Sequence, residues 1–385
     1  MKHKFIERGA DLDTLLEYLR SKSQIAIDLE FDKNRYQYGF TMCLMQVFDG
    51  SVCYLIDPLS KAVDITKTFP LIEDPAVMKI GFELGEDLRL FHLMGCSPKN
   101  IYDVSIAAKL LDHGQTSLVN LIGRVLGIST SKGSQKSNWL KRPLTSTQLE
   151  YAAEDVVFLF QLKEFFEADL KEKGMLEWVE QERVRLEDIK GEEQDVWSYI
   201  KSRDMKGVKE QDWQVFIRLM EFREELAKKY NKPSYQVLDK EYLLGLAQDE
   251  SMIRSFDQDA HALRLLRTGA FKQRLLEIAR SCRAEMMEQG VGNGTLAWKQ
   301  QDKEESRQAR ERKRREDAVI DTFLKPIQSS IKQELGEEAG TFIVGNRLMR
   351  ELASGIKDGL LDYKKELLLK HAKKAGVDLR KIQVE

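Results

Sequence analysis

The chain has 385 residues, of which 42% are hydrophobic and 32% are charged. This composition is typical of an ordinary folded protein and excludes an intrinsically disordered chain. No apolar run approaches the ~18–20 residues needed to span a bilayer. The formal net charge is −2, yet residues 201–385 hold 37 basic and 31 acidic side chains, whereas residues 1–200 hold 24 and 32. An acidic half joined to a basic half fits a metal-dependent catalyst beside an anion-binding module, although compositional drift alone would give the same charges.

The cysteines and the N-terminus bear on the cellular compartment. The four cysteines, at positions 43, 53, 96 and 282, form no Cys-x-x-Cys pair, which argues against a disulfide framework and against a structural zinc site. The first residues carry basic side chains but no apolar segment of the kind found in secretory signals. The sequence therefore predicts a cytoplasmic protein with no membrane partner.

Strand-like and helix-like segments alternate up to about residue 170. Strands are predicted where apolar or alternating runs end at turn signals, at residues 24–31, 42–48, 52–57, 78–82 and 101–103. Helices are predicted from apolar periodicity at 86–94, 104–112, 117–126 and 145–168. We therefore expect an α/β domain over residues 1–170, in which helices pack on a mixed sheet.

The remainder of the chain is predicted to be helical. Trp213, Phe216 and Met220 share one face of a helix, which is typical of an all-α domain. The expected divisions are a charged helical linker at 171–207, a helical domain at 208–287, a second charged linker at 288–317 and a C-terminal helical region at 318–385.

Two carboxylates stand in an otherwise apolar strand. Asp28 and Glu30 are two residues apart, so both point to the same face, because side chains of a strand alternate with period two. Burying two like charges side by side is costly unless a cation lies between them. Oxygen ligands suit hard divalent ions such as Mg²⁺ or Mn²⁺. Most Asp-x-Glu triplets are nevertheless solvated surface charges, so the pair alone does not establish a metal site.

Two further acids follow the predicted strands. Asp87 lies near the start of the helix after the strand at 78–82, where an acid commonly complements the helix dipole. Tyr151 and Asp155 are four residues apart and share one helical face, which continues through the apolar Phe158. An acid on the apolar side of a helix is hard to explain as a surface residue, whereas Tyr151 alone would more often be a core aromatic.

In their order and context these residues resemble the DEDD 3′–5′ exonucleases of the tyrosine subtype, and the ribonuclease D-like members in particular. The resemblance covers about residues 5–170 and implies a ribonuclease H-like exonuclease domain. The histidine subtype would have a histidine where this chain has Glu150. Three motifs carry the resemblance, and they are matched by Ile27–Phe31 with the downstream runs 44–46 and 55–58, by Lys79–Phe91, and by Ser137–Asp155.

The functional residues of the family carry over to matching positions of this chain. Asp28, Glu30, Asp87 and Asp155 match the four metal ligands, and Tyr151 matches the residue that positions the attacking water. The resemblance implies two divalent ions, Mg²⁺ or Mn²⁺, and a hydrolysis that releases nucleoside 5′-monophosphates. Candidate substrate contacts lie in or beside the motifs, with packing roles left open for them: Gln46, Phe82, Lys132, Gln135, Ser137 and Trp139.

Residues 208–287 resemble the helicase-and-ribonuclease-D C-terminal (HRDC) domain, a small helical module that commonly accompanies this exonuclease. The resemblance rests on Asp212–Trp213 through 222–229, on Lys232–Pro233 and on 237–239, and it fades past about residue 250. The region 318–385 is a candidate second module of this kind. Arg310–Arg315 has five basic residues in six. Such runs are usually solvated helix faces, and beside a nuclease a phosphate-contacting role is equally open.

We predict a two-metal-dependent 3′–5′ exoribonuclease that acts on the single-stranded 3′ ends of structured RNA, such as tRNA precursors. A DNA exonuclease of the same superfamily is one alternative, because nothing in the sequence reads the ribose 2′-hydroxyl. A non-catalytic nucleic-acid-binding scaffold is the other. We disfavour the scaffold, because such a protein is expected to have lost at least one metal carboxylate, and all four are present. A Rossmann-type binder is weaker still, since no Gly-x-Gly-x-x-Gly follows the first predicted strand.

Overall fold

Two compact units make up the chain. The computed structural model describes residues 2–114, 117–130, 137–192, 196–290, 298–356 and 359–378. One unit, which we call the sheet unit, comprises residues 1–31, 42–192 and 311–385. The other, which we call the helical unit, comprises residues 32–41 and 193–310. Two segments that the sequence separates from the predicted α/β domain, 171–192 and 318–385, thus pack with it in the sheet unit.

A six-stranded mixed sheet forms the centre of the sheet unit. β1 pairs in parallel with β4, β3 pairs antiparallel with β4, and β5 pairs in parallel with both β2 and β6. β2 lies between β3 and β5, which explains its apolar composition, and Ile25, Ala26 and Ile27 are all buried. In the order in which they lie across the sheet, the strands are β1 (His3–Ile6), β4 (Cys53–Ile56), β3 (Phe40–Phe48), β2 (Gln24–Lys33), β5 (Met78–Gly81) and β6 (Ile101–Asp103).

The predicted strands all form, with ends that shift by one or two residues. Sequence patterning does not predict β1, an edge strand of four residues whose first two side chains are exposed, because so short a run carries no clear alternation. The prediction of one helix over 145–168 is wrong: α6 (Ser146–Val157) and α7 (Leu159–Glu172) are separate helices. They part at Phe158, where the backbone leaves regular helical geometry at φ −96° and ψ −6°.

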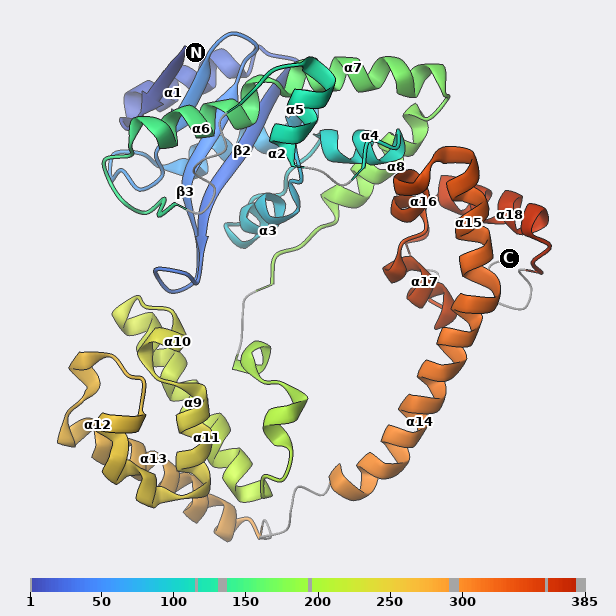
Figure 1. Ribbon diagram of the computed structural model, residues 1–385. Helices are drawn as coiled ribbons and strands as arrows, with labels where there is room; N and C mark the ends of the chain where they lie inside the picture. Colours follow the sequence, from blue (N-terminus) through green and yellow to red (C-terminus); the bar gives the residue numbers. More distant parts are fainter. Residues whose placement is uncertain are drawn as a thin grey trace. The chain divides into compact units, whose positions relative to one another are not determined.

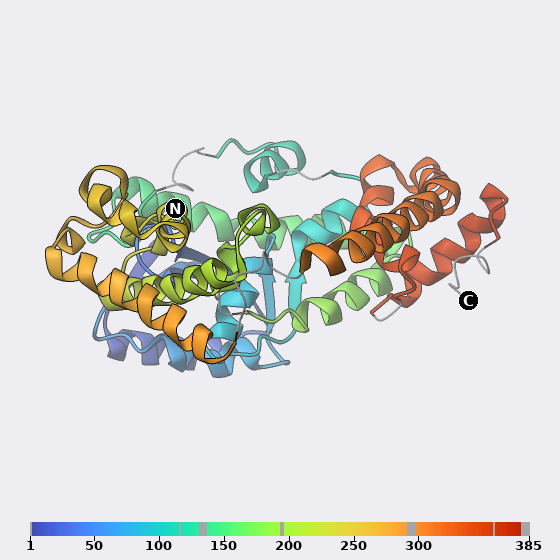
Figure 2. The ribbon, with the colours of Figure 1, turned by 90° about the horizontal axis from the view of Figure 1, so that it is seen from below.

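Helices cover both faces of the sheet (Figures 1 and 2). α6 packs against β4, and α7 packs against β5 and α4. Within the described ranges, no helix is long and apolar enough to cross a membrane. Besides α6 and α7, the helices of this part of the unit are α1 (Gly9–Leu19), α2 (Phe69–Glu73), α3 (Gly85–Leu93), α4 (Val104–Leu110), α5 (Leu118–Leu126) and α8 (Leu176–Glu187).

The C-terminal helices belong to the packing of the sheet unit. The Tyr363 ring stacks on Trp178 with centroids 5.0 Å apart, and the Tyr363 hydroxyl donates a 2.6 Å hydrogen bond to the buried Glu182 carboxylate. The Lys364 Nζ lies 2.7 Å from the same carboxylate. Asp112 accepts hydrogen bonds from two backbone amides of the first turn of α16. The helices are α15 (Lys325–Leu335), α16 (Glu337–Ile343), α17 (Asn346–Ala353) and α18 (Asp362–Ala375), together with α14 (Trp298–Val319) from residue 311 on.

The helical unit has a core of its own. Trp213, Phe216 and Met220 are buried on one face of α9, as their spacing predicts. Tyr38 packs against this core from residues 32–41, the tip of the hairpin that joins β2 to β3. A mixed sheet with helices, followed by helical structure, confirms the predicted fold class. The helices are α9 (Glu210–Tyr230), α10 (Ser234–Val237), α11 (Lys240–Gln248), α12 (Phe256–Asp259) and α13 (Gly269–Glu288).

Candidate active site

β2 brings two of the predicted carboxylates together at the centre of the sheet. Asp28 and Glu30 occupy alternate positions of this strand, and α6 adds Asp155. One carboxylate oxygen from each of the three lies within 4.8 Å of the other two. Three oxygens so close together can bind one hard divalent cation, because such ions bind carboxylates at roughly 2.0–2.6 Å.

The fourth predicted carboxylate comes from the start of α3. Asp87 is 6% exposed, and its Oδ1 has no hydrogen-bond partner among the described residues. The backbone amide of Leu29, which stands between Asp28 and Glu30, donates to the Asp87 carboxylate. Asp103 holds the turn before α3, since it accepts the Glu83 amide at 3.0 Å and the next amide along the chain at 3.1 Å. The buried orphan oxygen is of the kind that a metal ligand leaves when no ion is present.

α6 carries the remaining two residues of the motif. Thr145 caps the helix, and its side chain and that of Gln148 form a reciprocal capping box, which fixes where the helix begins. Tyr151 and Asp155 follow on one face, four residues apart, and the Tyr151 hydroxyl donates to the Asp155 carboxylate. The helix start therefore sets the position of both functional groups.

The four carboxylates repel one another inside the protein. Burial, and next the negative charges of the other acids, hold the pKa values of Asp28 and Glu30 well above their ordinary range. Burial also raises the pKa of Asp87 to about 8 and that of Asp155 to about 7. Among the described residues that line the cleft around these carboxylates, none has a cationic side chain. A bound divalent cation would therefore offset the repulsion between the carboxylates. The acidic cluster thus fits divalent metal ions.

A cleft of about 830 Å³ opens over the carboxylates. Phe82 lines it, as predicted for a substrate contact, together with Glu83 and Glu86. Residues 117–120, the N-terminal cap and first turn of α5, also line it. The sequence predicts this helix but no role for it, because only the fold brings its N-terminus to the carboxylates.

Three other predicted substrate contacts are buried or bonded behind the cleft surface. Gln46 is fully buried on β3, and its Nε2 lies 3.4 Å from Asp28 Oδ2. Trp139 is 3% exposed, and its ring centroid lies 6.2 Å from that of Tyr151. Ser137 accepts a 3.2 Å hydrogen bond from Gln148. None of the three lines the cleft. Lys132 and Gln135 lie outside the described residues.

Arg142 ties the third motif to the sheet, and the sequence does not predict this role. Its guanidinium makes a two-pronged ion pair with Asp57, with both distances at 2.7 Å. It also donates to the backbone carbonyl of Cys43 at 2.6 Å and to that of Trp139 at 2.7 Å. The loop that carries Trp139 is thereby fixed beside Tyr151. Arg142 and Asp57 lie within the matched motifs at 137–155 and 55–58. No local sequence pattern predicts that two residues so far apart along the chain form a pair.

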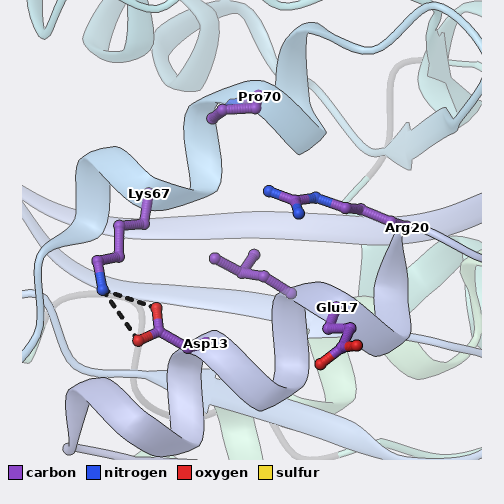
Figure 3. A pocket seen from close by; sticks show the side chains of 6 residues that line it. Asp13, Glu17, Arg20, Lys67 and Pro70 are labelled. Atoms are coloured by element: carbon purple, nitrogen blue, oxygen red, sulfur yellow. Dashed lines mark hydrogen bonds and ion pairs between the residues drawn. The ribbon is translucent and has the colours of Figure 1, made fainter.

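A second hollow, of about 470 Å³, lies between α1 and the turn before α2 (Figure 3). Lys67 Nζ reaches both oxygens of Asp13, at 2.7 and 3.0 Å, across this hollow. It shares no residue with the carboxylate cleft. Asp13 and Lys67 are held in this mutual ion pair, so these two side chains offer no catalytic group.

Known proteins are similar to this chain over its first half in particular. Residues 4–171 match the family model described as 3′–5′ exonuclease. A ribonuclease D from Zymomonas mobilis is 35% identical over 189 residues, which make up 48% of this chain and 48% of that protein. A ribonuclease D from Xanthomonas oryzae is 28% identical over 271 residues, 68% of this chain and 74% of that protein. The chain spans about half the length of the first curated relatives it matches.

Solved structures share the fold over a longer range. The crystal structure of Escherichia coli RNase D, an exoribonuclease involved in structured RNA processing, covers 97% of this chain and 99% of its own, with a TM-score of 0.68 and 21% identity. The catalytic core of RRP6 from Trypanosoma brucei covers 74% of this chain and 80% of its own, with a TM-score of 0.62 and 22% identity. At these identities the two structures establish a common fold.

Proposed function

We propose that residues 4–171, which match the 3′–5′ exonuclease model and are similar to ribonuclease D, form an exonuclease domain that hydrolyses RNA from its 3′ end. The observation that carries the proposal is the meeting of Asp28, Glu30 and Asp155 within 4.8 Å, with the orphan oxygen of Asp87 beside them. All four carboxylates of the motif are present. A scaffold that had abandoned catalysis would have no need to keep so costly a cluster.

Asp28, Glu30, Asp87 and Asp155 would hold two divalent ions, Mg²⁺ or Mn²⁺. Bound there, such a pair supplies activation of a water for attack on the terminal phosphorus and stabilisation of the leaving 3′-oxygen. The short distances between the carboxylate oxygens and the raised carboxylate pKa values support the metal site. A cation favours the ionised form of a carboxyl group, which burial disfavours.

Tyr151 orients the attacking water. Burial and the neighbouring acids, Asp155 foremost, raise the pKa of the Tyr151 hydroxyl far above its ordinary value, so the hydroxyl stays protonated near neutral pH. A protonated hydroxyl can hold a water by hydrogen bonding but cannot take its proton as a base. Gln46 orients the Asp28 carboxylate from behind, because it is fully buried and lies against it.

The cleft has the chemistry needed to bind the 3′ end of a single-stranded RNA. Phe82 offers an apolar face for the terminal base, and the α5 N-terminus offers backbone amides toward a phosphate. We propose single-stranded 3′ ends of structured RNA as the substrate class, such as those of tRNA precursors, in line with the description of E. coli RNase D. Residues 208–287 would form an HRDC-like module that accompanies the exonuclease domain.

The test uses the full chain and 5′-labelled oligonucleotides of one sequence, as RNA and as DNA, with Mg²⁺ or Mn²⁺. We expect a ladder of RNA products shortened from the 3′ end, and no ladder when the 3′ end carries a phosphate. Asp28→Asn should abolish the ladder, whereas Asp188→Asn, which removes an exposed acid at the end of α8, should leave it intact. Faster shortening of DNA would favour the DNA exonuclease, and full activity of Asp28→Asn would exclude the proposed site.

A further inference from the structure

The first strand of the sheet has one open edge. β1 stands last in the strand order, next to β4, and no strand or isolated bridge of the described ranges lies on its other side. The carbonyls of Lys2 and Ile6 accept hydrogen bonds from amides at the start of β4 and just after its end, at 3.2 and 2.9 Å. Because the backbone groups of a strand alternate between its two sides, those of His3 and Phe5 point to the open edge. Such an edge is a template for another extended chain.

A hollow of about 660 Å³ lies beside this edge, between β1, β4 and α1. Ile6, Leu15 and Tyr54 give the hollow an apolar lining, and all three are buried. Tyr18 of α1 also lines it and is 43% exposed. A strand added to a sheet edge gains affinity from main-chain hydrogen bonds and specificity from pockets that receive its alternate side chains. The open edge and the hollow together supply both.

Asp49 holds the two tyrosines of the hollow in place. The hydroxyls of Tyr18 and Tyr54 both donate to Asp49 Oδ2, at 3.0 and 3.3 Å. The other carboxylate oxygen accepts the backbone amides of Ser51 and Val52, both at 2.7 Å. The tyrosine rings are therefore fixed from behind, and the hollow is formed before any ligand arrives.

Cations flank the hollow and the open edge. Lys2 and Lys4 are exposed, and Lys4 Nζ lies 5.9 Å from the centroid of the Tyr54 ring. Lys22 Nζ lies 4.5 Å from the centroid of the Tyr18 ring. The charge available to a ligand on the β1 side is thus positive, which favours a ligand that carries carboxylates.

Two acids of α1 that lie near the edge are already paired. Asp11, which lines the hollow, makes a 2.6 Å ion pair with Arg8. Asp13 makes a 2.7 Å ion pair with Lys67. Their charges are offset within the fold, so they do not cancel the attraction of the β1 lysines for an acidic ligand.

The same lysines disfavour a second copy of this chain as the occupant. Pairing two copies of β1 would bring Lys2 and Lys4 of one copy close to those of the other, and like charges across a strand pair are destabilising. Lysines on an edge strand commonly prevent such self-association. An acidic strand meets no such barrier, because its carboxylates would lie beside the lysines.

We propose that β1 accepts an extended acidic segment of a partner protein as an added strand, with one apolar side chain in the hollow. The backbone of His3 and Phe5 makes the new hydrogen bonds, and Lys4 meets a carboxylate. Since side chains on one face of a strand stand two residues apart, the segment carries its acid two residues from its apolar anchor. The hollow shares no lining residue with the carboxylate cleft, and the inference is independent of the proposed hydrolysis.

The experiment selects peptides from a phage-displayed library of random decapeptides on the immobilised full chain. The most enriched peptide is then synthesised with a fluorophore, and its affinity is measured by anisotropy. We expect enriched peptides to be acidic, with an apolar residue two positions from an acid. Binding of the synthetic peptide should slow deuterium exchange of the amides of residues 3–6.

A proline variant tests the open edge itself. Phe5→Pro removes an amide that points away from β4, a position where an edge strand tolerates proline. Its matched control is Phe5→Ala, which loses the same ring and keeps the amide. The proline variant should bind the peptide roughly five-fold more weakly than the alanine variant. His3→Pro against His3→Ala repeats the comparison at an exposed side chain, should the Phe5 variants misfold.

A pair of charge variants tests the lysines. Lys2→Gln/Lys4→Gln should weaken binding about five-fold at low salt, and the difference from wild type should shrink as KCl is added. Lys171→Gln/Lys173→Gln removes the same charge at exposed positions at the end of α7. This control should bind the peptide as wild type does.

Several results would overturn the proposal. These are a library with no peptide enriched on wild type over Phe5→Pro, enriched peptides without excess acid, equal affinities of the proline and alanine variants, or exchange slowed only outside β1. A wild-type dimer in sedimentation equilibrium that Phe5→Pro dissociates would assign the edge to a second copy and would overturn it as well.

Discussion

Replacing Arg142 by methionine should destabilise the sheet unit and slow hydrolysis together. The substitution removes both prongs of the pair with Asp57, whose side chain is 6% exposed, and the hydrogen bonds to the carbonyls of Cys43 and Trp139. Removing one partner of a buried pair costs about 3–5 kcal/mol. Because the Arg142 side chain is itself 25% exposed, solvent screening places the expected loss at the low end, about 3 kcal/mol.

Thermal melting and kinetics test this reasoning together. A loss of that size lowers Tm by about 6–12 °C in a unit of this size. The turnover number should fall about ten-fold or more, because Trp139 would no longer be fixed beside Tyr151. Arg8→Met is the control, since it breaks a similarly short pair with Asp11 that is exposed to solvent, and its Tm should stay near that of wild type. A wild-type Tm and turnover in Arg142→Met would refute the assigned role.

Three further predictions follow from the site and its supports. Tyr151→Phe should lower turnover at least ten-fold while RNA affinity in EDTA stays unchanged, because it removes the hydroxyl and keeps the ring. Without metal, stability should fall as pH rises from about 5 to 8. The raised pKa values of the buried acids mean that the folded protein holds protons the unfolded chain has released, and this contribution is lost as pH passes the folded-state values. Tm in EDTA should therefore drop over this range, with a shallower slope in Asp28→Asn, and a flat profile in wild type would contradict the shared burial of the carboxylates. Tyr363→Phe should cost about 1–3 kcal/mol, because the buried Glu182 loses a partner, and a urea midpoint equal to that of wild type would show that the bond contributes nothing.

The sequence predicts the strand that carries Asp28 and Glu30 well, because its signal is local. Asp28 and Glu30 interrupt an apolar run at period two, and that pattern alone places both on one face of β2. The same holds for Tyr151 and Asp155 at helical spacing. The order of these residues then suffices for the resemblance to the DEDD exonucleases, and residues 4–171 match the 3′–5′ exonuclease model.

Contacts between distant parts of the chain explain what the sequence left open. Arg142 and Asp57 are 85 residues apart, and Tyr38 and Asn231 are 193 apart. No local pattern records such a pairing. The inward packing of Trp139 and Gln46 was not predictable for the same reason. The sequence of a motif does not show whether a neighbouring aromatic or amide side chain faces a substrate or the core. Likewise, the packing of the C-terminal helices on α4 and α8 depends on contacts between distant residues, such as that between Tyr363 and Glu182.

The central claim is that the four carboxylates hold divalent ions for hydrolysis. Crystals of the full chain grown with saturating Mn²⁺, with data collected at the manganese absorption edge, test it most directly. We predict two anomalous peaks between β2, α3 and α6, with Asp28 as a ligand, and their loss in Asp28→Asn. Clear density for the carboxylates with no anomalous peak at saturating Mn²⁺ would contradict the account.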